Sequence, residues 1–130
     1  MNAEAVMPRR KRGAYNGYPS YDARMIDAAT IQNTIRVLLN AAPAGSRVIL
    51  FGSHARGDAG EKSDLDILIV EPEVHGRLAE AARLDRALRG LGVPVDLLVT
   101  SEAMFEAWKD TPNSVLHEAA REGKVFREMA

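Results

Sequence analysis

The stretch from Val48 to Val70 constrains the fold of this chain more than any other part of its sequence. Residues 48–51 form a short apolar run, which is typical of a buried strand. Gly52 interrupts this run, and a glycine allows the backbone to turn sharply and to come close to a ligand. Residues 63–70 are again mostly apolar and predict a second strand. The stretch therefore predicts two strands joined by a tight turn and a short polar segment.

The turn at Gly52 and Ser53 is a candidate phosphate site. If a short helix begins after it, backbone N–H groups and the Ser53 hydroxyl face outward together, and such groups bind anions. Asp64 and Asp66 belong to the second predicted strand, where residues i and i+2 share one face. Their carboxylates repel each other unless a cation lies between them, and Mg²⁺ prefers oxygen ligands of this kind. The spacing indicates a site for a nucleoside triphosphate with Mg²⁺.

A third acidic residue, Asp96, interrupts the apolar run 93–100, which predicts another strand. A charged group inside a buried strand costs free energy unless it is paired or binds a metal. This cost favours a place for Asp96 in the site. The alternative is a strand end at which its carboxylate reaches solvent. We expect the carboxylates of Asp64, Asp66 and Asp96 to converge beside the turn at Gly52.

The remaining segments predict an α/β fold, or α+β in some schemes, with a small mixed sheet flanked by helices. Helices are predicted at 22–42, 76–90 and 115–122, and strands at 47–51, 63–70, 93–100 and 124–128, the last at a sheet edge. The first helix begins near Asp22 or Asp27, and Ser101 caps a further helix. The inward residues of that further helix are predicted to be Met104, Phe105 and Trp108.

These motifs carry a resemblance to a known family. The order Gly52-Ser53, ten further residues and Asp64-Leu65-Asp66 resembles the signature of the DNA polymerase beta-like nucleotidyltransferase superfamily. The spelling Gly-Ser-His-Ala-Arg-Gly and Ser-Asp-Leu-Asp-Ile-Leu-Ile is similar to that of its minimal nucleotidyltransferase (MNT) branch. The family's third carboxylate lies on a later strand, where this chain has Asp96. The resemblance covers residues 22–128 and implies a nucleotidyltransferase fold for them.

The resemblance also implies a reaction, namely transfer of AMP from ATP to a hydroxyl group with release of pyrophosphate. Asp64 and Asp66 would hold two Mg²⁺ ions, and Asp96 would bind the metal at the attacking oxygen. Gly52 and Ser53 would hold the β- and γ-phosphates. These roles are what the family implies for the matching positions of this sequence.

Two residues between the motifs have open roles. Arg56 suits two functions equally well: contact with the triphosphate or orientation of the active-site carboxylates, and a structural ion pair with Asp58 or another nearby acid. His54 could act as a general base, but a lone histidine beside a turn is more often a surface residue.

Composition limits the class of protein. The 130 residues and the hydrophobic share of 46% predict one domain, residues 21–130, with a buried core. Residues 1–20 lack periodicity and hold four basic residues against Glu4, which predicts a disordered basic tail of net charge +3. The overall charge of −1 then leaves −4 for the rest of the chain. This acidic body argues against a nucleic-acid-binding surface.

The chain has no cysteine, which excludes a disulfide framework and a Cys-ligated zinc site. No apolar run is long enough for a membrane span, and the N-terminus has no apolar core typical of a signal peptide. We therefore expect a cytoplasmic protein.

The acceptor hydroxyl is the main open question. Nothing after residue 128 is expected to form an acceptor-binding domain, so the acceptor itself, in a homo- or hetero-oligomer, is expected to complete the site. The resemblance implies a HEPN partner, a helical ribonuclease toxin, which the MNT antitoxin adenylylates on a tyrosine. One alternative is a small-molecule acceptor such as an aminoglycoside. Another is a non-catalytic antitoxin that acts by binding alone, against which the complete set Asp64, Asp66 and Asp96 weighs.

Overall fold

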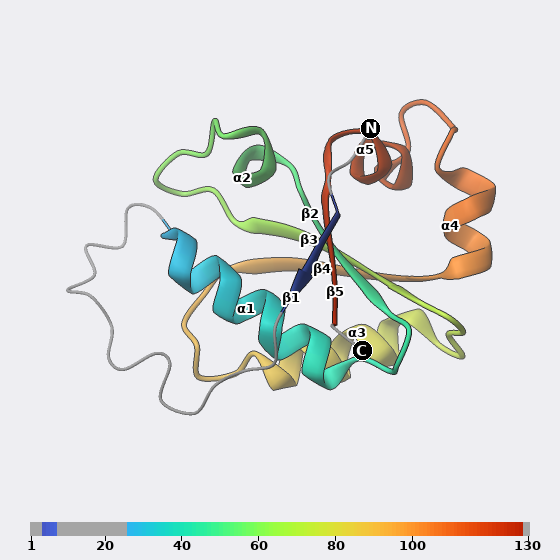
Figure 1. Ribbon diagram of the computed structural model, residues 1–130, viewed down its shortest axis with the longest axis horizontal. Helices are drawn as coiled ribbons and strands as arrows, with labels where there is room; N and C mark the ends of the chain where they lie inside the picture. Colours follow the sequence, from blue (N-terminus) through green and yellow to red (C-terminus); the bar gives the residue numbers. More distant parts are fainter. Residues whose placement is uncertain (1–3, 8–25, 129–130) are drawn as a thin grey trace.

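The computed structural model describes residues 4–7 and 26–128, which form one mixed sheet with helices against it (Figure 1). The strands are β1 (Glu4–Met7), β2 (Arg47–Phe51), β3 (Leu65–Glu71), β4 (Val95–Ser101) and β5 (Lys124–Glu128). Their order across the sheet is β1-β5-β2-β3-β4. β2 is antiparallel to both of its neighbours, whereas β1 with β5 and β3 with β4 are parallel pairs. The predicted small mixed sheet is confirmed.

Helices cover both faces of this sheet. They are α1 (Ala28–Ala41), α2 (Ser53–Arg56), α3 (Arg77–Ala87), α4 (Glu102–Trp108) and α5 (Val115–Glu122). Buried residues of α1 and α3 belong to one hydrophobic cluster, and Phe105 of α4 and Ala119 of α5 belong to another. Figure 1 accordingly shows α1 beside α3, and α4 beside α5. None of the helices in the described part of the chain is long and apolar enough to cross a membrane.

Strand β3 is buried on both faces and divides the two clusters. The residues on the side of α1 and α3 are Leu65, Ile67 and Ile69, and those on the side of α4 and α5 are Leu68 and Val70. Side chains of a strand alternate between faces, so a strand covered by helices on both sides needs a nearly continuous apolar run. Asp66 has the same parity as Leu68, and it therefore lies on the α4–α5 face.

The ends of the central strands differ from the sequence prediction. β3 begins at Leu65 rather than at residue 63, and β4 covers 95–101 rather than 93–100. The Leu65 N–H donates to the carbonyl oxygen of Pro94 at 3.0 Å, which is the first link between the two segments. Pro94 has no N–H to continue the pairing in the other direction. Asp64 consequently lies directly before β3 and not within it.

The predicted position of the last strand was also wrong, because β5 is not at an edge. β1 pairs with its outer side in parallel register, from Glu4 opposite Val125 to Met7 opposite Glu128. Residues 4–7 belong to the segment predicted as a disordered tail. Their backbone groups pair with those of β5, which is distant in the sequence, so no local pattern predicts this strand. The rest of that tail, and the candidate cap Asp22, lie outside the described residues.

Helix caps agree with the prediction. The Asp27 carboxylate accepts a hydrogen bond from the Thr30 N–H at 2.7 Å, and the Ser101 hydroxyl accepts one from the Met104 N–H at 3.1 Å. The inward face of α4 was predicted wrongly, since Met104 and Trp108 are 45% and 47% exposed and Phe105 is buried. Met104 and Trp108 are four residues apart and share one side of the helix, about 100° and about 60° away from Phe105.

Glu71 ends β3 as a buried acid, with a relative exposure of 2% and no hydrogen-bond partner for Oε2. Glu80 of α3 lies beside it and is paired with Arg83 at 2.7 Å, and Arg83 also donates to the Ala41 carbonyl at 2.9 Å. Burial, followed by the neighbouring Glu80, raises the pKa of Glu71 to about 8. Hydrogen bonds from Arg83 and Glu71 hold the pKa of Glu80 well below its ordinary value. Glu71 is therefore protonated at neutral pH.

We predict that the free energy of unfolding of Glu71→Gln rises relative to that of wild type as the pH increases from 5 to 8. Because the folded pKa of Glu71 is raised, the unfolded chain loses this proton first, and wild-type stability falls by at most about 1.4 kcal/mol per pH unit in this window. Urea unfolding at pH 5, 6.5 and 8 measures the difference. Glu73→Gln, which changes an exposed acid, should leave the wild-type slope intact. Equal slopes for wild type and Glu71→Gln would contradict the prediction.

Candidate active site

The register of the sheet brings two of the predicted acids together. Asp66 is the second residue of β3, and its pairing partners are Phe51 on β2 and Asp96 on β4. Residues directly opposite each other on neighbouring strands point to the same face. Asp66 and Asp96 thus lie side by side on the face covered by α4 and α5. A structure with Asp96 on the other face would have excluded a three-carboxylate site.

Asp64 completes this group from the residue before β3. The pKa of Asp66 is raised by burial first and then by the charges of Asp96 and Asp64, whereas His54 and Arg56 oppose the shift. The charges of Asp64 and Asp96 therefore both act on Asp66. We call Asp64, Asp66 and Asp96 the carboxylate cluster.

The carboxylate cluster has the chemistry of a divalent-cation site, but its side chains are not arranged as one. Nowhere in residues 4–7 and 26–128 do three acidic or histidine side chains come close enough to hold an ion as they stand. Carboxylate oxygens are nevertheless the ligands that Mg²⁺ prefers. A bound cation would also neutralise the negative charge that raises the pKa of Asp66. The donor chemistry of the carboxylate cluster therefore suits such an ion.

Asp96 enters the cluster for a different reason from the one that its sequence suggested. Its side chain is exposed, on the outermost strand of this side of the sheet. The expected cost of a buried charge is therefore absent, as in the alternative of a carboxylate that reaches solvent, but Asp96 still lies beside Asp66. What places Asp96 beside Asp66 is the parallel pairing of β3 with β4, which the sequence does not specify.

Gly52 lies under the Asp66 carboxylate. It adopts φ 74° and ψ −156°, a conformation that is almost confined to glycine. A Cβ atom added there would collide with Asp66 Oδ2 and would lie 3.0 Å from Cγ. The sequence predicted that the backbone at Gly52 comes close to a ligand. In the structure it comes close to the carboxylate of Asp66. Gly52 and Asp66 form one packed unit.

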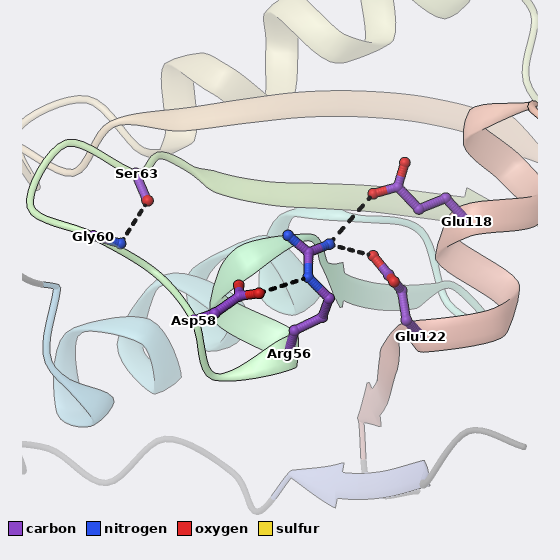
Figure 2. Close-up of polar contacts among 6 residues, drawn as sticks. All are labelled: Arg56, Asp58, Gly60, Ser63, Glu118 and Glu122. Carbon is purple, nitrogen blue, oxygen red and sulfur yellow. Dashed lines mark hydrogen bonds and ion pairs between the residues drawn. The ribbon is translucent and has the colours of Figure 1, made fainter.

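Ser53 follows as the first residue of α2, which confirms the predicted short helix after the turn. The next residue, His54, is half-buried, and its Nε2 lies 3.1 Å from the Ser63 carbonyl oxygen. The Ser63 hydroxyl accepts a hydrogen bond from the Gly60 N–H at 2.8 Å (Figure 2). These contacts close the loop between α2 and β3 and fix the chain directly before Asp64.

Arg56 forms ion pairs with three acids, as Figure 2 shows. Its Nε lies 3.2 Å from Asp58, and its Nη1 lies 2.8 Å from Glu122 and 4.0 Å from Glu118. Of the two roles predicted for Arg56, the structural ion pair is present. Contact with a phosphate stays a prediction.

Sequence reasoning missed Glu118 and Glu122. They are one helical turn apart on α5, and that spacing could have marked them as a pair on one face. The pKa of Glu118 is raised by burial, by Glu122 and then by Asp66, so this carboxylate borders the carboxylate cluster. Nothing local in the sequence indicates that α5 packs next to α2.

Known proteins resemble this chain in sequence. Residues 31–121 match the family described as nucleotidyltransferase domain. Two curated proteins of Methanocaldococcus jannaschii, both named "putative protein adenylyltransferase", are each 41% identical to it, over 59 and 54 residues. These matches cover 45% and 42% of this chain and 57% and 54% of the relatives. The chain thus spans about half the length of the curated relatives it matches.

A solved structure is similar as well. The crystal structure of a protein from Sulfolobus solfataricus, described as a "putative nucleotidyltransferase", superposes with a TM-score of 0.51 and is 26% identical in sequence. The superposition covers 75% of this chain and 87% of that protein. The shared fold agrees with the sequence match.

We predict that Gly52→Ala destabilises the protein by at least about 1 kcal/mol more than Gly57→Ala. Both glycines have positive φ, 74° and 87°, but a Cβ at Gly57 meets nothing within 4 Å. Urea unfolding of both variants measures the difference. Part of the excess should disappear in an Asp66→Ala background, which removes the carboxylate. An unchanged cost of Gly52→Ala in that background would show that Asp66 does not cause the clash.

Proposed function

Since the chain belongs to the nucleotidyltransferase domain family, we propose that it is an enzyme that transfers AMP from ATP to a hydroxyl group of a partner protein. The observation that carries this proposal is the in-register pair of Asp66 and Asp96. Asp64 precedes the same strand, and the turn at Gly52 packs against Asp66. This order of turn and acids supports a nucleotide site, because a phosphate-binding turn next to a carboxylate group suits a triphosphate with its cations.

In this proposal the turn and the carboxylate cluster have separate roles. Gly52 and Ser53 bind the β- and γ-phosphates through backbone N–H groups and the Ser53 hydroxyl. Asp64, Asp66 and Asp96 would hold Mg²⁺, with two ions expected in all. When bound, these ions neutralise the negative charge of the attacking and leaving oxygens.

The reaction exchanges two bonds at the α-phosphorus. The acceptor oxygen forms a bond to this phosphorus while the bond to the bridging oxygen of the β-phosphate breaks, so pyrophosphate leaves with the electron pair of the broken bond. The proton of the acceptor hydroxyl passes to Asp96. An exposed position on the outermost strand suits this role, because a macromolecular acceptor can reach it.

The acceptor that we propose is a tyrosine of a HEPN toxin, which makes this chain the antitoxin of a HEPN/MNT pair in the cytoplasm. The name of the two Methanocaldococcus proteins, "putative protein adenylyltransferase", supports a protein acceptor. The resemblance of the motifs at Gly52-Ser53 and Asp64-Leu65-Asp66 to the MNT branch supports the choice of partner.

We predict that Asp64→Asn abolishes transfer of labelled AMP to the partner while the fold stays intact. Asparagine keeps the shape of the side chain and removes the charge that holds the metal, which should cost on the order of a thousandfold or more in rate. Asp110→Asn, which changes an exposed acid in the turn after α4, is the matched control and should keep wild-type activity. Ser53→Ala should have a milder effect, since the backbone N–H groups remain.

The same variant separates the alternatives. If Asp64→Asn protects cells from the toxin as well as wild type does, the antitoxin acts by binding alone. If labelled AMP appears on an aminoglycoside and not on the partner protein, the acceptor is a small molecule.

We predict that ATP binding requires Mg²⁺. The carboxylate cluster repels a triphosphate unless cations lie between them, and the nearby Arg56 is already paired with acids. Calorimetric titration with ATP should show affinity at least about a hundredfold weaker with excess chelator than with Mg²⁺. Equal affinity under both conditions would contradict the proposed use of metal.

A further inference from the structure

Helix α2 has little of its own to hold it in place. It is four residues long, contains no buried residue and has no side-chain cap at its N-terminus. Its packing against the core comes from the partly buried Ala55. The proposed transfer requires the turn at Gly52, which leads into α2, to stay at a fixed distance from the carboxylate cluster. The packing of Gly52 on Asp66 holds the start of this turn, and the contact of His54 with the Ser63 carbonyl holds α2 to the following loop. A contact with another helix would hold α2 to the rest of the fold.

Arg56 supplies such a contact through α5. Helix α5 is anchored in the core, because Ala119 is fully buried and a Cβ at Gly123 would collide with Ile49 Cγ2 and the Ala119 carbonyl. Glu122 projects from this anchored helix and accepts a hydrogen bond from Arg56 Nη1 at 2.8 Å (Figure 2). A short, charge-assisted bond of this kind restricts the orientation of both partners.

We propose that Glu122 is a positioning residue, which holds the Arg56 guanidinium and thereby fixes α2 and the Gly52–Ser53 turn against α5. This inference rests on the proposed function and deepens it. In this proposal Arg56 pairs with Glu122 of α5 and does not contact a phosphate of the nucleotide. Glu122 acts on the turn through Arg56.

The other two acids around Arg56 are less suited to this role. Asp58 lies two residues further along the same segment, so its contact at 3.2 Å cannot tie α2 to another part of the fold. Glu118 is on α5 but lies 4.0 Å away. The Glu122 side chain is 28% exposed, less than the side chains of Asp58 and Glu118 at 62% and 45%. Water therefore screens the contact with Glu122 the least.

The charges also favour a guanidinium that stays in place. Arg56 lies among three carboxylates, and Glu118 and Glu122 are one turn apart on the same side of α5. If Arg56 moved to a phosphate, these two acids would face each other without a cation, which is unfavourable at this spacing. A triphosphate would have to compensate for that repulsion before it gained from the contact.

The test compares Glu122→Gln with Glu106→Gln. Glu106 is an exposed acid in an ion pair with Lys109 at 3.0 Å, on α4, and serves as the matched control. The first readout is amide hydrogen exchange by NMR in the ligand-free protein. The N–H groups of Ala55 and Arg56 bond to the Gly52 carbonyl. In Glu122→Gln these two should exchange about fivefold faster, the effect expected for loss of a partly exposed ion pair, while the core strands keep their protection.

The second readout separates positioning from phosphate binding. In steady-state transfer assays, Glu122→Gln should raise KM for ATP about threefold to tenfold and leave KM for the acceptor unchanged. Arg56→Gln should have the same effect, and the double variant should be no worse than either single variant, because both act through one contact. If Arg56 binds phosphate instead, Glu122→Gln frees it, and ATP binds equally well or more tightly. That result would overturn the proposal.

The two proposals fail in different experiments. Absence of AMP transfer by the wild-type protein with its partner would remove the proposed function, and hydrogen exchange would still decide whether Glu122 holds α2. Unchanged amide hydrogen exchange at Ala55 and Arg56 in Glu122→Gln would disprove the positioning role even if AMP transfer occurs. Unaltered exchange and kinetics in Glu106→Gln show that loss of any exposed acid is not the cause.

Discussion

The parallel pairing of β3 with β4 is the constraint on which the candidate site depends. It sets Asp66 opposite Asp96, and the alternation of each strand then carries both carboxylates to the α4–α5 face. A register shift of one residue would turn Asp96 to the other face and would also expose the apolar residues of β4 that pack on α1 and α3. The hydrophobic cores therefore hold the acids in place.

Two acids of β3 illustrate how position decides the chemistry of a carboxyl group. Glu71, at the end of the strand, is buried on the side of Arg83 and keeps its proton at neutral pH. Asp66, five residues earlier, faces the other side and lies half-buried beside Asp96 and Asp64. The first carboxyl belongs to the core and the second can meet a ligand. The same strand thus carries a structural acid at one end and a candidate catalytic acid at the other.

The surroundings of Asp66 have more negative than positive charge. Asp64 and Asp96 raise its pKa, and Glu118 borders the same cluster from α5. The guanidinium of Arg56, whose charge lowers the pKa of Asp66, is shared among Asp58, Glu118 and Glu122. This imbalance explains why the site suits a divalent cation and why a triphosphate would depend on one. It also agrees with both proposals, in which the acids around Arg56 hold α2 and the nucleotide binds through the metal.

The sequence by itself determined the local parts of this protein. The apolar run 48–51 and Gly52 predict strand and turn correctly, because backbone preferences act over a few residues. The spacing of Asp64 and Asp66 predicts both on one strand, but only Asp66 belongs to β3. Tertiary structure alone decided the rest. The partner of Asp96, the contact of Arg56 with Glu122 and the place of β1 beside β5 each join distant segments. Such contacts follow from how whole strands and helices pack, which no short pattern encodes.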